Sequence, residues 1–220
     1  MAGLFISFEG IEGSGKSTQV GLLAETLRTQ GYEVVVTREP GGTPLGQVLR
    51  RLLLEPRETS LAPGAELLLM LADRVQHIQE VIAPALQGGK IVISDRFVDS
   101  TTAYQGYGRG IALDLLAQLN AFTCGQYLPD VTLLLDLPVA DGLQRAGQRQ
   151  RSATGTDPFE AESLDFHERV RMGFLAVARA NPTRIQVVDA ARPREEIHKE
   201  IVALVQSRLG EKRHPMTGSR

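Results

Sequence analysis

The chain has 220 residues, of which 42% are apolar and 23% charged, and its formal net charge is -2. This length and composition can bury one sizeable core, so we expect a single domain over residues 1–210 and a flexible tail over 211–220. The near-neutral charge gives no overall attraction to nucleic acid or to an acidic membrane. Any phosphate group would have to be bound by local positive side chains.

The single cysteine and the pattern of apolar residues exclude several other classes. Cys124 has no partner for an internal disulfide framework or a zinc site of thiolates, and we expect it to pack as a small apolar residue. The first residues carry no basic segment, and their apolar run is too short for a signal peptide. No stretch reaches 18 apolar residues. We therefore expect a cytoplasmic protein without a membrane anchor.

Short apolar runs rich in β-branched residues predict strands, and helical patterns fill the gaps between them. The runs cover residues 4–8, 34–36, 91–93, 131–135 and 185–188. Short strands that alternate with helices are typical of a parallel sheet covered by helices. The predicted fold class is therefore α/β, doubly wound, with a five-stranded parallel sheet.

The helical segments differ in how clearly the sequence marks them. Apolar residues between the first two predicted strands fall on one helical face, and Gly31 follows as a C-cap. Residues 66–86 predict a long, mostly buried helix that ends before Gly88 and Gly89. Residues 148–155 are polar, basic and non-periodic, so we expect a mobile surface segment there.

Residues 10–17 read Gly-Ile-Glu-Gly-Ser-Gly-Lys-Ser and match the phosphate-binding loop G-x-x-x-x-G-K-[ST] between a predicted strand and a predicted helix. Backbone N–H groups of such a loop surround a β-phosphate, and the helix N-terminus adds partial positive charge. We expect Lys16 to reach the β- and γ-phosphates of ATP and Ser17 to bind Mg²⁺. A glycine-rich turn that only opens a helix is the plainer alternative. The predicted nucleotide-binding residues are Gly10, Ile11, Glu12, Gly13, Ser14, Gly15, Lys16, Ser17 and Thr18.

The loop alone does not define the reaction, because GTPases, ATP-driven motors and small-molecule kinases share it. A GTPase would need a guanine-reading Asn-Lys-x-Asp segment, and the sequence has none. A remodelling ATPase would pair its strand-end Asp with a neighbouring Glu, whereas here Arg96 follows Asp95. An arginine at that position suits a second phosphate group better than an activated water.

Four blocks of the sequence resemble bacterial thymidylate kinases along nearly the whole chain. The blocks are residues 8–17, 37–43 (Thr-Arg-Glu-Pro-Gly-Gly-Thr), 72–74 (Ala-Asp-Arg), and 95–97 with 100–106 (Asp-Arg-Phe and Ser-Thr-Thr-Ala-Tyr-Gln-Gly). The resemblance implies a homodimeric P-loop kinase, with a closing lid over about residues 148–160, that phosphorylates thymidine monophosphate with ATP. A kinase for another deoxynucleotide or nucleoside and a non-catalytic nucleotide-binding protein are the alternatives.

Phosphoryl transfer to a nucleoside monophosphate needs no general base, because its second pKa of about 6 leaves it largely ionised at neutral pH. The protein has to align two polyanions and neutralise their repulsion, which requires Lys and Arg. We expect Lys16 and Arg96 to be catalytic, with Asp95 orienting Mg²⁺ through water. A structural ion pair for Arg96 and a helix N-cap for Asp95 are the alternatives. The histidines show no ligand or triad spacing.

The resemblance also implies which residues hold the phosphate and sugar of the acceptor. Arg38 would lie in the acceptor site and Arg50 would approach its phosphate, although Arg51 adjoins Arg50 and only one of the two can face the site. Glu12 would contact the deoxyribose 3′-hydroxyl. Tyr104 would crowd the 2′ position and so favour deoxyribose, and a core packing role is its alternative.

For the base, the resemblance implies that Arg74 bonds a thymine carbonyl, with Thr101 and Gln105 beside the ring. Packing and helix-start roles are the alternatives. Where many relatives carry Phe, this chain has Met70, so stacking on the base would be weaker or come from Leu71.

The lid segment also departs from the family pattern. Pro158 stands where bacterial relatives typically carry a catalytic arginine. We expect Arg149 or Arg151 to supply the missing positive charge, and a basic solvated loop is the alternative.

Overall fold

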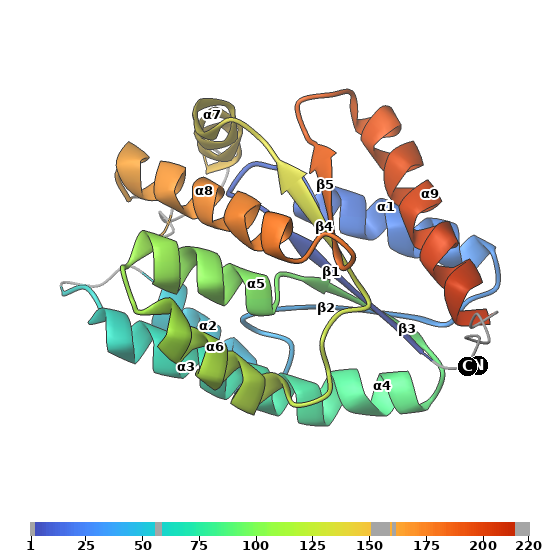
Figure 1. Ribbon diagram of the computed structural model, residues 1–220, viewed down its shortest axis with the longest axis horizontal. Coiled ribbons are helices and arrows are strands. Elements are labelled where there is room, and N and C mark those ends of the chain that lie inside the picture. The colour runs from blue at the N-terminus through green and yellow to red at the C-terminus, as the bar shows by residue number, and fades with distance from the viewer. Residues whose placement is uncertain (1–2, 56–58, 151–158, 160–161, 214–220) are drawn as a thin grey trace.

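Five parallel strands form one sheet in the order β2-β3-β1-β4-β5 (Figure 1). The computed structural model describes residues 3–55, 59–150, 159 and 162–213. The strands are β1 (Leu4–Glu9), β2 (Val34–Arg38), β3 (Ile91–Asp95), β4 (Val131–Asp136) and β5 (Ile185–Asp189). The predicted α/β fold with five parallel strands is confirmed. Each strand ends one or two residues later than its apolar run, because its last residues are polar.

Helices cover both faces of the sheet, as expected for a doubly wound fold (Figure 1). On one face α1 and α9 pack against the strands, and on the other α3, α4, α5, α6 and α8 lie over them. The helices are α1 (Lys16–Thr29), α2 (Pro44–Leu54), α3 (Pro63–His77), α4 (Ala83–Gln87), α5 (Val98–Thr101), α6 (Leu113–Cys124), α7 (Val139–Gln150), α8 (Leu164–Ala180) and α9 (Arg194–Arg213). Two π-helical segments, η1 (Ile78–Ile82) and η2 (Thr102–Gly108), continue α3 and α5.

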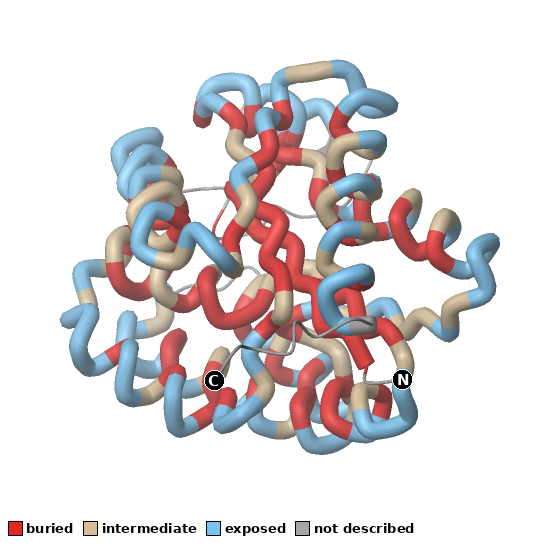
Figure 2. The backbone as a smooth tube through the Cα atoms, turned by 45° about the vertical axis from the view of Figure 1, so that its right-hand side comes forward, coloured by how far each residue is buried: buried red, intermediate tan, exposed pale blue. Residues whose placement is uncertain are grey.

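The core lies along the strands, where Figure 2 shows an almost unbroken run of buried residues. Side chains alternate across the sheet, so Leu4, Ile6 and Phe8 of β1 pack toward α1 and α9, whereas Phe5 packs toward the opposite cluster. Because both faces are covered, β1 is buried along its whole length, and apolar residues occupy four of its six positions. Cys124 is buried in the same cluster as Phe5, as predicted.

The helix predicted over residues 66–86 exists, but it is less buried than expected. It consists of α3, η1 and α4, and it ends at Gln87, before Gly88 and Gly89. Only one face is buried, since Leu68 is 64% exposed and Val75 is 42% exposed. The predicted burial holds for the inner face, but Val75, which the apolar pattern placed with the core, lies on the outer face.

Two expected boundaries also change. Helix α9 continues through residues 211–213, which were expected to belong to the tail, because Lys212 Nζ donates 2.7 Å hydrogen bonds to Gly3 O and Asp130 Oδ2. Helix α7 includes residues 148–150, where the lid was expected to begin. In the described part of the chain, no helix is both long enough and apolar enough to span a membrane.

Candidate active site

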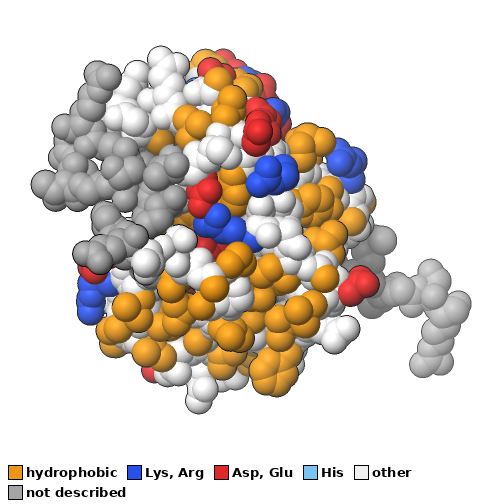
Figure 3. Space-filling model, turned by 90° about the vertical axis from the view of Figure 1, so that its left-hand side faces the viewer, with side chains coloured by type: hydrophobic (Ala, Val, Ile, Leu, Met, Phe, Trp, Pro, Cys, Tyr) orange, Lys and Arg blue, Asp and Glu red, His pale blue; other side chains and the backbone are white. Residues whose placement is uncertain are grey.

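A cavity of about 280 Å³ opens at the carboxyl ends of β1, β2 and β3. Its wall combines the loop after β1 with the ends of β2 and β3 and with residues from α2, α3, α5 and η2. In Figure 3, charged side chains of both signs lie near the centre of the face that contains these strand ends. In open α/β sheets, ligands bind at the carboxyl ends of the strands. They bind where the connections that follow two neighbouring strands run to opposite faces of the sheet and leave a crevice between them.

The loop after β1 has the backbone geometry of a phosphate cradle. Gly13 has a φ of +74°, and a Cβ at this position would clash with the backbone of Gly142, so only glycine fits. Lys16 is the first residue of α1, and its Nζ donates to Gly10 O at 3.0 Å and to Ile11 O at 2.8 Å. Burial and the nearby positive charge of Arg96 lower the pKa of Lys16 to about 8. The lysine therefore points into the loop, beside the place where a nucleotide phosphate would lie.

Ser17 and Asp95 meet at the base of the same cavity. Ser17 Oγ donates a 2.6 Å hydrogen bond to Asp95 Oδ2. Asp95 ends β3 and lies beside Phe8 of β1, which explains why it faces the loop that follows β1. It does not cap the next helix, whose N-cap position is Phe97. Ser17 Oγ and Asp95 Oδ2 are hard oxygen donors, and together they suit a cation such as Mg²⁺ beside the start of α1.

Arg96 makes a dense set of contacts in the cavity wall. Its φ of +72° is the one left-handed backbone conformation among the described residues that are not glycine, and such strain clusters at functional sites. Its Nη1 donates to Gly10 O at 3.0 Å, and its Nη2 donates to Glu12 Oε1 at 2.8 Å and to Tyr104 OH at 3.0 Å. The guanidinium also lies 4.9 Å from the centre of the Tyr104 ring. Arg96 is therefore held in place before any ligand binds.

Glu12 is a buried carboxylate that remains ionised. Burial opposes its charge, but Arg96, the neighbouring His167, Lys16 and Tyr104 outweigh that cost, so the pKa of Glu12 lies well below its usual range. Tyr104 OH donates to Glu12 Oε1 at 2.6 Å. The pKa of Tyr104 is raised well above its usual value because burial disfavours the phenolate, although Arg96 opposes this shift. Tyr104 consequently stays a neutral donor to Glu12.

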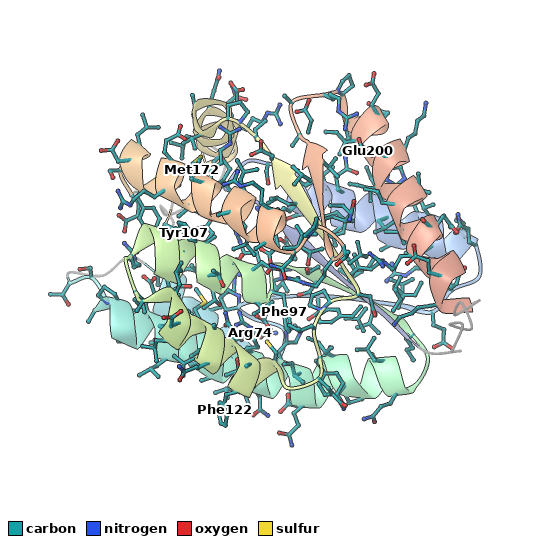
Figure 4. All side chains as sticks on the ribbon, viewed as in Figure 1. Arg74, Phe97, Tyr107, Phe122, Met172 and Glu200 are labelled. Atoms are coloured by element: carbon teal, nitrogen blue, oxygen red, sulfur yellow. The ribbon has the colours of Figure 1, made fainter. Side chains whose placement is uncertain are left out.

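Arg74 is fixed by three hydrogen bonds in the deep part of the cavity. Its Nε donates to Glu39 Oε2 at 2.9 Å, its Nη1 to Asn120 Oδ1 at 3.1 Å, and its Nη2 to Thr101 Oγ1 at 2.7 Å. The guanidinium lies 5.2 Å from the centre of the Phe97 ring, and Figure 4 shows both side chains inside the molecule. Both Arg74 and Phe97 line the cavity.

A second layer of polar residues holds Glu39. His77 Nδ1 lies 3.0 Å from Glu39 Oε1, and His77 Nε2 lies 2.6 Å from Thr37 Oγ1. Thr37, Glu39 and His77 come from β2, the residue after it and the end of α3. No role was predicted for these residues or for Phe97. The Thr-Arg-Glu-Pro-Gly-Gly-Thr block was the available signal for Thr37 and Glu39. Nothing in the sequence identified His77 as their partner.

The arginines expected at the acceptor phosphate occupy one side of the cavity. Arg38 ends β2, is exposed and lines the cavity. Arg50 lines the cavity as well, and its Nη1 donates to Pro40 O at 2.9 Å. Arg51 is exposed and is not part of the cavity wall.

Most of the residues expected around the base line the cavity, but one does not. Met70, Thr101 and Gln105 line the cavity, and Gln105 Nε2 donates to Glu66 Oε1 at 2.9 Å. Leu71 does not line the cavity, because it is buried in a separate cluster between α3 and α6. The suggestion that Leu71 could stack on a base is therefore wrong.

Of the expected lid residues, Arg151 and Pro158 lie outside the described residues, and so does the side chain of Arg149. Phe159 is described and buried. Its ring lies 5.6 Å from that of Tyr104 in an edge-on arrangement, and it contributes to the cavity wall. The end of the expected lid thus packs on the residue that binds Glu12 and Arg96.

Comparisons with known proteins give one consistent result. The thymidylate kinase family model matches residues 8–201. The chain is 54% identical to the thymidylate kinase of Desulfovibrio desulfuricans over 88% of this chain and 91% of that protein. It is 51% identical to the thymidylate kinase of Pseudomonas fluorescens over 95% of this chain and 98% of that protein. The crystal structure of thymidylate kinase from Ehrlichia chaffeensis superposes with a TM-score of 0.74 at 38% identity and covers 93% of this chain and 99% of its own. The chain belongs to the thymidylate kinase family.

Proposed function

We propose that the cavity binds ATP at the loop after β1 and thymidine monophosphate beside it, and that the enzyme transfers the γ-phosphate of ATP to the monophosphate. The observation that carries this proposal is the continuity of one cavity. Its wall includes Lys16 and Ser17 of the nucleotide loop, and also Arg74, whose guanidinium is held rigidly at the far end. A donor triphosphate and an acceptor base can therefore occupy a single space.

The nucleotide side of the cavity fits ATP together with Mg²⁺. Lys16, at the start of α1, would bind the β- and γ-phosphates, since its ammonium lies among the loop carbonyls. Ser17 would bind the cation, and Asp95 would hold one of its waters, because their oxygens are 2.6 Å apart at the mouth of the loop. Bound Mg²⁺ neutralises the charge that develops on the phosphate oxygens.

Arg96 is the residue best placed to hold the acceptor phosphate against the γ-phosphate. It lies between the loop backbone at Gly10 and the sugar-contacting candidates Glu12 and Tyr104. The side chain of Arg38, which is exposed and lines the cavity, would add a second positive charge at that phosphate. An oxygen of the acceptor phosphate attacks the γ-phosphorus, the bond to the ADP oxygen breaks, and no proton has to be removed first.

Specificity for thymine would come from the deep end of the cavity. Arg74 has three of its N–H groups committed to Glu39, Asn120 and Thr101, so its remaining donors have a fixed direction toward the cavity. A carbonyl oxygen matches such a donor, whereas the amino group of cytosine does not. Phe97 and Met70 supply apolar surface in the same wall.

Turnover with ATP and a panel of monophosphates tests the proposal. Thymidine monophosphate should have the highest kcat/KM. Deoxycytidine monophosphate should be rejected by about 10⁴, and deoxyuridine monophosphate, which lacks only a methyl group, by about 10–200-fold. Lys16→Ala should abolish transfer while keeping the unfolding transition of the wild type. Equal use of the cytosine and thymine nucleotides would overturn the assignment of Arg74.

A homodimer is supported by apolar side chains that remain exposed on two adjacent helices. Leu68 and Val75 lie on the outer face of α3, and Leu115 and Phe122, which is 83% exposed, lie at helical spacing on α6. Figure 3 shows hydrophobic side chains gathered over the lower part of its face, and Figure 4 shows Phe122 pointing outward. A second copy of the chain would cover this surface.

Light scattering of two single variants tests the dimer. Phe122→Glu should convert the protein to a monomer. Met172→Glu, a change at an exposed residue on α8 away from Phe122 (Figure 4), should leave the mass unchanged. A monomeric wild type would contradict the proposal.

A further inference from the structure

A buried histidine lies beside the nucleotide loop without a hydrogen-bond partner. His167 of α8 is fully buried, and within the described part of the chain neither of its ring nitrogens makes a hydrogen bond. Glu12 Oε2 is also buried and also has no hydrogen-bond partner. His167 Nδ1 lies 3.6 Å from this oxygen, an ion-pair distance that is slightly too long for a hydrogen bond. The two unsatisfied groups therefore face each other.

An imidazole with two unsatisfied nitrogens is costly inside a protein. A buried polar group without a partner destabilises the fold, because it loses its hydrogen bonds to water without gaining others. The surroundings of α8 are otherwise apolar, since Phe166, Val170 and Phe174 pack in one cluster with Tyr104. An apolar side chain at position 167 would avoid the cost, so packing alone does not explain the histidine.

The helix that carries His167 is held close to the acceptor residues. A Cβ on Gly108 of η2 would come within 2.7 Å of the Phe166 ring, and one on Gly173 of α8 would come within 2.7 Å of Tyr107. Helix α8 and η2 therefore approach at glycines, and their spacing has little freedom. Helix α8 begins at Leu164, so His167 lies in its first turn.

The two oxygens of Glu12 have different environments. Oε1 accepts from Arg96 Nη2 at 2.8 Å and from Tyr104 OH at 2.6 Å. Oε2 accepts no hydrogen bond from the described residues, and His167 Nδ1 lies 3.6 Å from it. A donor on Oε2 would fix the rotation of the carboxylate and so keep Oε1 directed at Arg96.

We propose that His167 is a positioning residue, which donates from Nδ1 to Glu12 Oε2 in the working enzyme and thereby fixes the carboxylate that orients Arg96 and Tyr104. The inference rests on the proposed roles of Glu12 and Arg96 in acceptor binding. A shift of a few tenths of an ångström shortens the 3.6 Å separation to a hydrogen bond. His167 itself does not touch the substrates.

Three substitutions separate this role from a structural one. His167→Leu removes both nitrogens. His167→Asn keeps a donor near the position of Nδ1, and His167→Gln moves it to the position of Nε2. We expect Leu and Gln to lower kcat/KM for thymidine monophosphate by about 10–100-fold, the range for loss of a hydrogen bond to a charged group, and Asn to stay within about threefold of wild type. Thermal unfolding of the Leu variant should match or exceed that of the wild type.

His198→Leu is the matched control, because it removes an imidazole from α9, which lies on the opposite face of the sheet, and it should leave kcat/KM unchanged. In a double-mutant cycle, His167→Leu should have little further effect in a Glu12→Gln background. If Glu12→Gln retains full activity, the proposed role of Glu12 fails. If Glu12→Gln is impaired but His167→Leu is not, only the inference about His167 fails. Loss of both stability and activity in the Leu variant without rescue by Asn would also overturn it.

Discussion

Ser17 Oγ donates a 2.6 Å hydrogen bond to Asp95 Oδ2, which joins the first turn of α1 to the end of β3. The two residues are far apart in the chain, but Asp95 is the last residue of β3 and Ser17 follows the loop that leaves the adjacent parallel strand β1. The same arrangement brings a hydroxyl and a carboxylate to the place where the nucleotide loop opens. Both oxygens are suitable for Mg²⁺, either directly or through water.

Asp95→Asn should weaken the binding of Mg²⁺ without unfolding the protein. Loss of an outer-shell carboxylate typically costs about 10–100-fold in metal affinity, so half-maximal activity should require correspondingly more Mg²⁺. A Mg²⁺ titration at saturating substrates measures this. Asp136→Asn is the control, since Asp136 also ends a strand but pairs with Arg171 and is not part of the cavity wall. An unchanged Mg²⁺ midpoint in Asp95→Asn would contradict the assignment.

Tyr104→Phe should separate two functions of one side chain. The variant keeps the ring, and with it the steric block proposed against a 2′-hydroxyl, but loses the hydrogen bonds to Glu12 and Arg96. We expect kcat to fall by about 10-fold or more, because both partners are charged. The preference for thymidine monophosphate over its ribose counterpart should remain. If the variant instead accepts the ribonucleotide with unchanged kcat, the hydroxyl and not the ring reads the sugar.

Much of the fold could be predicted because the strands consist mainly of apolar residues, many of them β-branched. Apolar β-branched runs identified all of the strands, and the glycine-rich loop identified the start of α1. The pattern failed at the strand ends, where Arg38 and Asp95 are polar and yet still pair with their neighbours. Arg38 and Asp95 line the cavity, so in β2 and β3 the apolar pattern missed the residues that contribute to the candidate site.

The supporting residues could not be predicted because their roles depend on contacts between distant elements. His77 reaches Glu39 and Thr37 only because the end of α3 packs against the end of β2. Phe97 is one residue in a recognisable block, but its place beneath Arg74 depends on the packing of α3 on that block. The π-helical segment that carries Gln105 has no sequence period of its own.

Glu9→Gln should change how stability depends on pH. Burial and the negative charge of Asp99 raise the pKa of Glu9 from 4.5 to about 8, so folding favours its protonated form. The group therefore contributes most stability below pH 4.5 and loses that contribution as pH rises through about 8. Gln mimics the protonated acid and can still accept from Phe97 N, which lies 2.8 Å from Glu9 Oε1.

Urea unfolding of both proteins at pH 5 and at pH 9 measures this effect. The stabilities should be similar at the lower pH. At the higher pH the variant should be more stable by at least about 1.4 kcal/mol, the equivalent of one pKa unit. Parallel pH profiles would show that Glu9 is already ionised at neutral pH.

The lid segment lacks the arginine that its relatives typically carry at the position of Pro158. Pro158 cannot donate a hydrogen bond, so if closure brings a positive charge to the transferring phosphate group, that charge must come from Arg149 or Arg151. Replacing both arginines with Ala should lower kcat by at least about 10²-fold, since an arginine in the transition state is worth about 10³–10⁵ in related phosphoryl transfer enzymes. The KM for thymidine monophosphate should change little, because the interaction would exist only in the transition state.

A control with the same loss of charge decides whether the effect is local. Arg194 and Lys199 are exposed on α9, so the Arg194→Ala, Lys199→Ala variant removes two positive charges from the opposite side of the sheet. Its kcat should equal that of the wild type. If the lid variant keeps its kcat and only its affinity for ATP or its solubility shifts, the lid arginines are ordinary solvated charges. Arg96, Lys16 and Mg²⁺ would then supply the electrostatic stabilisation alone, and Arg96→Ala should abolish transfer completely.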